Sequence, residues 1–198
     1  MNAMAVETEP LRRIAHLRPA RVCEAIELGE AGRAALAQDP SPSQFLSTLI
    51  MAECHEDAVR YLAHALPRPD AVRWACDCVQ ALQGAALSVT AVAALGAVRR
   101  WLAHPGAAQC REAAEAAEAE GMKDQGAARF ATLAAAWSGE SLAPEGMPPT
   151  APAPELGALA VTAAVMIAAA HGEPGRMVER YRECLSRGIL MARAAATV

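Results

Sequence analysis

The sequence contains few aromatic residues and almost no lysine. Aromatic side chains make up 4% of the 198 residues, and Lys123 is the one lysine among 18 basic residues. Runs of β-branched residues are also missing, and strands are enriched in β-branched and aromatic side chains. Alanine, the strongest helix former, supplies about a quarter of the chain. We therefore expect an all-α protein with closely packed helices.

Positive charge and long apolar runs are scarce as well. The formal net charge is -4, which gives no electrostatic reason to expect nucleic acid or an anionic membrane as a partner. The uncharged, alanine-rich run Leu156 to Ala170 has about fifteen residues, whereas a transmembrane helix needs about twenty. Arg12 and Arg13 are not followed by the apolar stretch of a signal peptide, so we expect a cytoplasmic protein.

Motifs for catalysis and ligand binding are missing too. The chain has no GxSxG, HExxH, phosphate loop or GxGxxG. Cys76 and Cys78 would point about 200° apart on a helix, which does not suit one zinc ion. The six cysteines fall mostly in apolar helical stripes, where thiols stay reduced and buried. The sequence thus predicts no catalytic residue, no cofactor and no metal, although a Cys–His nucleophile pair remains an alternative.

The clearest pattern is a pair of helices within Glu56–Leu82, joined by a turn at Leu66–Asp70. Apolar residues recur at helical spacing on both sides of the turn, and the two prolines in it interrupt the helix. Short connections favour antiparallel neighbours. We expect Tyr61 and Trp74 to pack near one another, with Trp74 in the core.

The same spacing predicts eight to ten helices in total and no sheet. We expect residues 1–9 to form a disordered tail and residues 10–198 to form a single domain of antiparallel helical hairpins, arranged as an irregular bundle or a short solenoid-like array. The other helices are expected at Pro19–Leu28, Glu30–Ala37, Ser43–Ala52, Val89–His104, Gln109–Glu120, Gly126–Trp137, Leu156–His171 and Gly175–Ala195.

A proline-rich segment separates the last two helices from the rest. Leu142–Pro154 holds five prolines and cannot be helical. We expect residues 143–154 to cross one face of the domain and to lead into a C-terminal helical hairpin, residues 155–198. A simple strap that holds this hairpin in place is the alternative.

The proline-rich segment is also the predicted partner-binding surface. A stiff segment loses little entropy on ordering, and we expect Leu142 and Met147 to anchor it on the helices beside Trp137. A rigid, partly apolar surface next to a tryptophan suits protein docking. The predicted partner-binding residues are Trp137, Leu142, Met147, Pro148 and Pro149.

Two stretches carry a resemblance to a known family. AVRYLAHALPRPDAVRWACDCV (Ala58–Val79) and AAAWSGESLAPEGMPP (Ala134–Pro149), followed by last helices that include ERYRECLSRGI, resemble an uncharacterised family of all-helical bacterial proteins. Its members are sometimes labelled twin-arginine signal proteins. The resemblance covers the chain from about Arg18 onward and implies a context of type VI secretion accessory genes. It carries no catalytic residues.

These observations together predict a non-enzymatic adaptor or chaperone-like accessory protein. Its expected partner is another protein, and the resemblance implies a secreted effector or a spike or tip component of type VI secretion. One alternative is an immunity protein that caps a toxin. The other is an enzyme that uses a Cys or His in a helical cleft. The sequence predicts no oligomeric state.

Overall fold

The computed structural model describes residues 10–14, 16, 18–119, 121–143 and 146–195. These residues form helices and no strand, within one domain, which confirms the all-α expectation. The expected tail, residues 1–9, lies outside the described part of the chain. The helices are α2 (Pro19–Cys23), α3 (Glu30–Leu36), α4 (Pro42–Met51), α5 (His55–Ala65), α6 (Arg68–Gln83), η1 (Gly84–Ala86), α7 (Val89–Ala103), α8 (Ala107–Glu118), α9 (Gly126–Ala136), α10 (Leu156–Ala170), η2 (Pro174–Arg176) and α11 (Met177–Arg193).

Local side-chain chemistry explains where several helices begin. Ser41 and Gln44 form a reciprocal capping box at the start of α4. Ser88 Oγ accepts a hydrogen bond from the N–H of Ala91 at 3.1 Å and caps α7. The first turn of α5 carries Glu56 and Asp57, whose charges suit the positive end of the helix dipole.

The helix expected at Pro19–Leu28 is shorter in the structure and ends at Cys23. The chain leaves the helix so that Leu28 is buried and the N–H of Gly29 donates to Asp57 Oδ2 at 3.0 Å. The helix therefore ends earlier than predicted because of contacts with residues far away in the sequence. The hydrogen bond to α5 and the burial of Leu28 outweigh local helix propensity.

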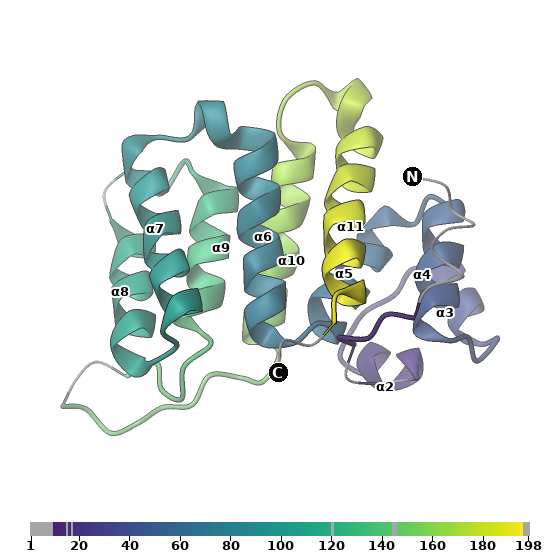
Figure 1. Ribbon diagram of the computed structural model, residues 1–198, viewed down its shortest axis with the longest axis horizontal. Coiled ribbons are helices and arrows are strands. Elements are labelled where there is room, and N and C mark those ends of the chain that lie inside the picture. The colour runs from purple at the N-terminus through teal and green to yellow at the C-terminus, as the bar shows by residue number, and fades with distance from the viewer. Residues whose placement is uncertain (1–9, 15, 17, 120, 144–145, 196–198) are drawn as a thin grey trace.

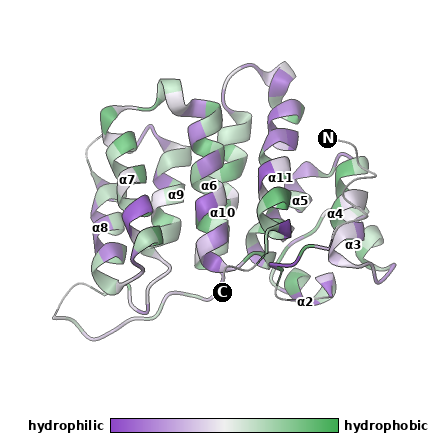
Figure 2. Ribbon diagram, viewed as in Figure 1, coloured by the Kyte–Doolittle hydropathy of each residue, from purple (hydrophilic) through white to green (hydrophobic). Residues whose placement is uncertain are grey.

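α10 lies at the centre of the arrangement. It packs against α5, α6, α9 and α11, with α7 and α8 beyond α9 and the N-terminal helices on the other side (Figure 1). Its fifteen residues carry no charge, and Figure 2 shows it white to green where α11 has hydrophilic turns. A helix that is apolar all round belongs in the interior of a helical domain. None of the helices in the described residues has both the length and the apolar character needed to cross a bilayer.

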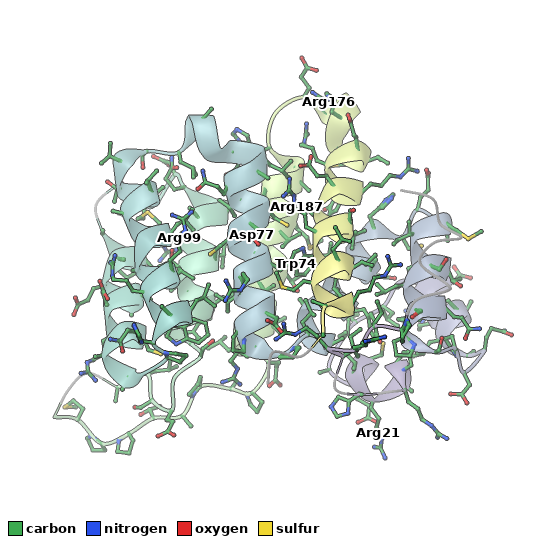
Figure 3. The ribbon with its side chains drawn as sticks, in the orientation of Figure 1. Arg21, Trp74, Asp77, Arg99, Arg176 and Arg187 are labelled. Carbon is green, nitrogen blue, oxygen red and sulfur yellow. The ribbon has the colours of Figure 1, made fainter. Side chains whose placement is uncertain are left out.

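The two helices of the predicted hairpin lie less against one another than against the last two helices. α10 and α11 each pack on both α5 and α6. Trp74 of α6 is fully buried, as expected, and its Nε1–H donates to the carbonyl of Cys184 in α11 at 2.8 Å (Figure 3). Tyr61 of α5 is also buried, and its ring meets Phe45 of α4 edge-on at 5.0 Å. The aromatic neighbour of Tyr61 is therefore Phe45.

Gly188 lets α11 approach both α5 and α6. A Cβ atom on this residue would lie 2.5 Å from Leu62 Cδ2 and 2.8 Å from Trp74 Cε2. These distances are shorter than van der Waals contact, so no larger side chain fits without movement of the core. Cys184, whose carbonyl receives the indole hydrogen bond, lies one helical turn before Gly188.

We predict that Gly188→Ala lowers the free energy of unfolding by about 1–3 kcal/mol, because the added methyl overpacks this junction. Urea denaturation followed by circular dichroism measures the change. Gly175→Ala is the matched control, since a Cβ there would meet nothing within 4 Å. Equal midpoints for the two variants would contradict the packing described here.

Candidate functional site

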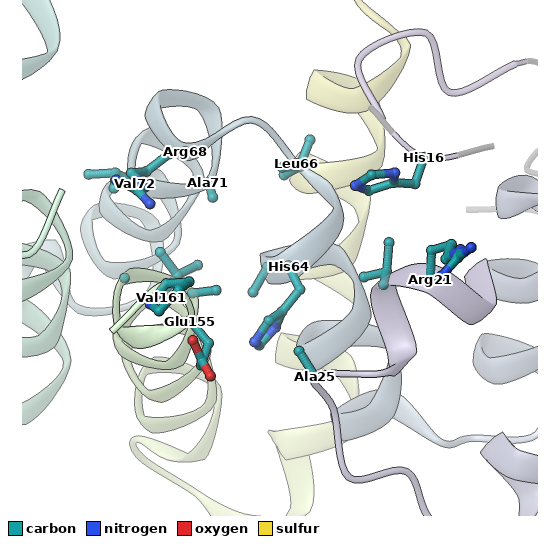
Figure 4. Close-up of a pocket in the computed structure, with 15 residues that line it drawn as sticks. His16, Arg21, Ala25, His64, Leu66, Arg68, Ala71, Val72, Glu155 and Val161 are labelled. Carbon is teal, nitrogen blue, oxygen red and sulfur yellow. The ribbon is translucent and has the colours of Figure 1, made fainter. Parts of the chain in front are cut away.

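A cavity of about 580 Å³ lies where α2, the C-terminal end of α5, and the first turns of α6 and α10 meet (Figure 4). Ligand pockets in proteins typically have volumes of about 300–1,000 Å³. Small and branched apolar side chains line the walls, among them Val22, Ala63, Ala71, Val72 and Val161. The alanines leave the space that larger side chains would fill.

Polar tethers hold the α2 wall in place. Before α2, the N–H of Arg13 donates to the carbonyl of Ala192 at 2.9 Å, and its Nε pairs with Asp70 Oδ2 at 2.8 Å. After α2, Gly29 is bonded to Asp57. The two ends of the wall are thus fixed to α11, α6 and α5, so the cavity depends on contacts between distant parts of the chain.

His64 presents an unsatisfied nitrogen at the cavity. Its Nδ1 lies 2.9 Å from the carbonyl oxygen of Arg60. Because a carbonyl can only accept, Nδ1 carries the hydrogen of this bond. Nε2 is buried and has no hydrogen-bond partner among the described residues. Figure 4 shows the ring extending from α5 toward the side where Glu155 lies. A buried nitrogen without a partner is costly, and a bound ligand could satisfy it.

Two arginines and one carboxylate also line the cavity. Arg21 and Arg68 lie on opposite sides, on α2 and α6 (Figure 4). Arg21 pairs with Glu24 at 3.2 Å where both side chains are exposed, and Arg68 donates to the carbonyl of Ser138 at 3.3 Å. Glu155 is the residue before α10 and makes no side-chain hydrogen bond that caps this helix, within the described chain.

The predicted partner-binding residues are not among those that line this cavity, and the segment that carries them reaches it at Pro154. We call residues 142–143 and 146–154 the proline strip. It runs along the lower edge of the molecule in Figure 1 and ends at Pro154, which lines the cavity. Trp137 is partly buried and packs against the core at the end of α9. Met147, Pro148 and Pro149 are exposed, as is Leu142.

The expected apolar anchoring of the proline strip is wrong. Leu142 and Met147 are 44% and 63% exposed, so they do not hold the strip on the helices. Hydrogen bonds close its base instead. The N–H of Leu142 donates to the carbonyl of Thr150 at 2.8 Å, and Ser141 Oγ accepts from the N–H groups of Ala143 and Thr150, each at 3.0 Å. The local signal for this closure is Ser141, because a serine hydroxyl commonly accepts backbone N–H groups at the base of a turn.

Four of the six cysteines are poorly suited to nucleophilic chemistry. All six are free thiols, and all except Cys54 are buried. Burial raises the pKa of Cys23 to about 11 and that of Cys76 to about 12. Burial also raises the pKa values of Cys78 and Cys110. The reactive species is the thiolate, which these groups hardly populate near neutral pH.

Residues 45–192 match the model of a family described as a family of unknown function (DUF6931). The chain belongs to this family. No curated protein and no solved structure matches the chain. The DUF6931 region includes the cavity walls from α5, α6 and α10 and the whole proline strip, but the α2 wall with Arg21 lies before it.

We predict that iodoacetamide modifies Cys54 first in the native protein, because it is the one cysteine that is not buried. Peptide mass spectrometry after brief alkylation measures the order, and alkylation in guanidinium chloride shows that all six thiols are free. Rapid native labelling of Cys76 or Cys78 would contradict the burial described here.

Proposed function

We propose that this protein is a non-enzymatic adaptor or chaperone-like accessory protein that binds another protein. The observation that carries the proposal is the continuity between the exposed proline strip and the cavity, which share Pro154. Exposed apolar residues on a strip of restricted conformation contribute contact area at low entropic cost. An adjoining apolar pocket can receive one anchoring side chain of the partner.

The chemistry of the cavity favours binding over catalysis. No cysteine lines it among the described residues, and burial raises the pKa values of Cys23 and Cys76, which argues against these two thiols as nucleophiles. His64 is bonded to the carbonyl of its own helix and has no carboxylate or thiol bonded to Nε2 among the described residues. An enzyme with a histidine in this cleft is therefore the less favoured alternative.

The resemblance of the two sequence stretches supports a finer proposal. It points to the cytoplasm of a bacterium and to effector loading in type VI secretion, with a secreted effector or a spike or tip component as the partner. An immunity protein that caps a toxin would use the same kind of surface. The identity of the co-purified protein separates the two roles, because an immunity protein neutralises the activity of its partner whereas an adaptor does not.

We predict that the partner binds at the proline strip and the cavity. The partner is first co-purified from the source organism and identified. The dissociation constant of its complex with this protein is then measured with the purified proteins. Replacing Met147–Pro154 by a Gly/Ser linker of equal length should weaken binding while the fold is retained. Ala158→Trp should do the same, because Ala158 is half-buried and lines the cavity.

Val89→Ser is the control for this experiment. Val89 is 88% exposed at the start of α7, at the opposite end of the helices from the strip (Figure 1). This substitution should leave binding unchanged. Unchanged binding and thermal stability in both test variants would show that the strip and cavity form neither an interface nor a strap. Reduced stability alone would favour the strap.

A further inference from the structure

We propose that the cavity binds the C-terminal carboxylate of a polypeptide whose last residue is apolar. This inference rests on the proposed protein-binding function and names the chemical group that the partner presents. Three features of the cavity point to it: apolar walls, unsatisfied hydrogen-bond donors and acceptors, and two arginines at the sides. The proline strip gives a reason for preferring a polypeptide to a small molecule.

The walls suit an apolar side chain. Val72 and Val161 are each 1% exposed, and Ala63 and Ala71 are almost as well buried. A leucine- or valine-sized group placed among them would lose most of its contact with water. Burying such a side chain stabilises a complex, because apolar surface is removed from water. The volume leaves room for the backbone of the same terminal residue.

The first turn of α10 offers hydrogen bonds to a carboxylate. Gly157 and Ala158 line the cavity, and N–H groups in a first helical turn have no acceptor within their own helix. No side chain caps α10 among the described residues. α6, which has sixteen residues, also begins at this cavity, with Pro67 before it and without a side-chain cap in the described chain. The positive end of α10 favours an anion. The first turn of α6 contributes less, because Pro69 has no N–H and Asp70 already carries a negative charge there.

His64 gives an independent indication of a missing ligand. His64 lines the cavity, and its Nε2 is buried without a hydrogen-bond partner among the described residues, while its Nδ1 is bonded to the carbonyl of Arg60. When the ring is protonated, Nε2–H donates to a carboxylate oxygen. When it is neutral, Nε2 accepts the N–H of the residue that carries the carboxylate. A terminal amino acid supplies both groups.

The arginines add a modest electrostatic preference. The present contacts of Arg21 and Arg68 are made at the surface and are weak, so both side chains are free to turn toward an anion. Glu155 has the opposite sign and opposes the same anion. Two positive charges face one negative charge, and the balance favours a carboxylate.

The proline strip favours a chain end over a small organic acid. It leaves the cavity at Pro154 as an exposed segment with apolar side chains, where the residues before a C-terminus would lie. A small acid would use the cavity and leave the strip unoccupied. Terminal carboxylates are recognised elsewhere by backbone N–H groups combined with a pocket for the last side chain.

The test compares two synthetic heptapeptides that end in Ala-Leu, one with a free carboxylate and one with a C-terminal amide, together with octanoate. Titration of the isotope-labelled full-length protein is followed by two-dimensional NMR. The free acid should shift the amide signals of Ala71, Gly157 and Ala158, and should bind at least about fivefold more tightly than the amide, as expected for a charged group at a partly exposed site.

Charge variants test whether positive charge at the cavity strengthens binding of the carboxylate. Arg68→Met should weaken binding of the free acid about two- to fivefold, and Glu155→Gln should strengthen it by a similar factor. Neither should change binding of the amide. Arg176→Met, at the opposite end of the molecule from Arg21 in Figure 3, is the control and should change nothing. Ala158→Trp should abolish binding of both peptides, with its fold checked by circular dichroism.

Three outcomes would overturn the inference. Equal binding of acid and amide within the cavity would exclude the carboxylate while leaving protein binding intact. Tighter binding of octanoate than of the free acid would assign the cavity to a small organic anion. Shifts confined to residues outside the cavity, or no saturable shifts, would exclude the site. Failure of the proposed function is seen separately, in unchanged affinity for the co-purified partner after replacement of the strip.

Discussion

The close approach of α11 to α5 and α6 at Gly188 is the contact on which the arrangement depends. At this position, a residue without a side chain lies against Leu62 and Trp74. The Trp74 indole reaches the carbonyl of Cys184 one turn earlier on the same helix. α10 and α11 each pack against both α5 and α6, and α5 and α6 pack less closely against each other.

This looser packing of α5 against α6 explains the position of the cavity. α5 ends and α6 begins at the short turn around Pro67, and α10 begins beside them after the proline strip. The space between these helix ends is covered by α2, which is tethered through Arg13 and Gly29. A larger residue at position 188 would push α11 outward. The distance between α5 and α6, whose ends line the cavity, would then change.

Several elements could be predicted from the sequence because their causes are local. The start of α7 follows from Ser88, and the break between α5 and α6 follows from the prolines at 67 and 69. Trp74 could be assigned to the core because it falls on the apolar stripe of its helix. In each case one side chain, or one periodic pattern, determines the outcome.

The errors and omissions have long-range causes. α2 ends early because Gly29 bonds to Asp57, 28 residues away. The cavity joins His16, His64 and Val161, which no local pattern links. Its alanine walls look like ordinary helix surface in the sequence. The exposure of Leu142 and Met147 depends on the path of the strip past the helices, and apolar composition alone does not determine that path.

A double-mutant cycle at Leu62 and Gly188 tests the central claim most directly. The free energy of unfolding is measured for Leu62→Ala, Gly188→Ala and the double variant. Shortening Leu62 removes the atom that a Cβ at position 188 would meet first. We expect the double variant to be more stable than the sum of the two single losses implies, by about 0.5–3 kcal/mol. Simple additivity would contradict direct contact between α11 and α5.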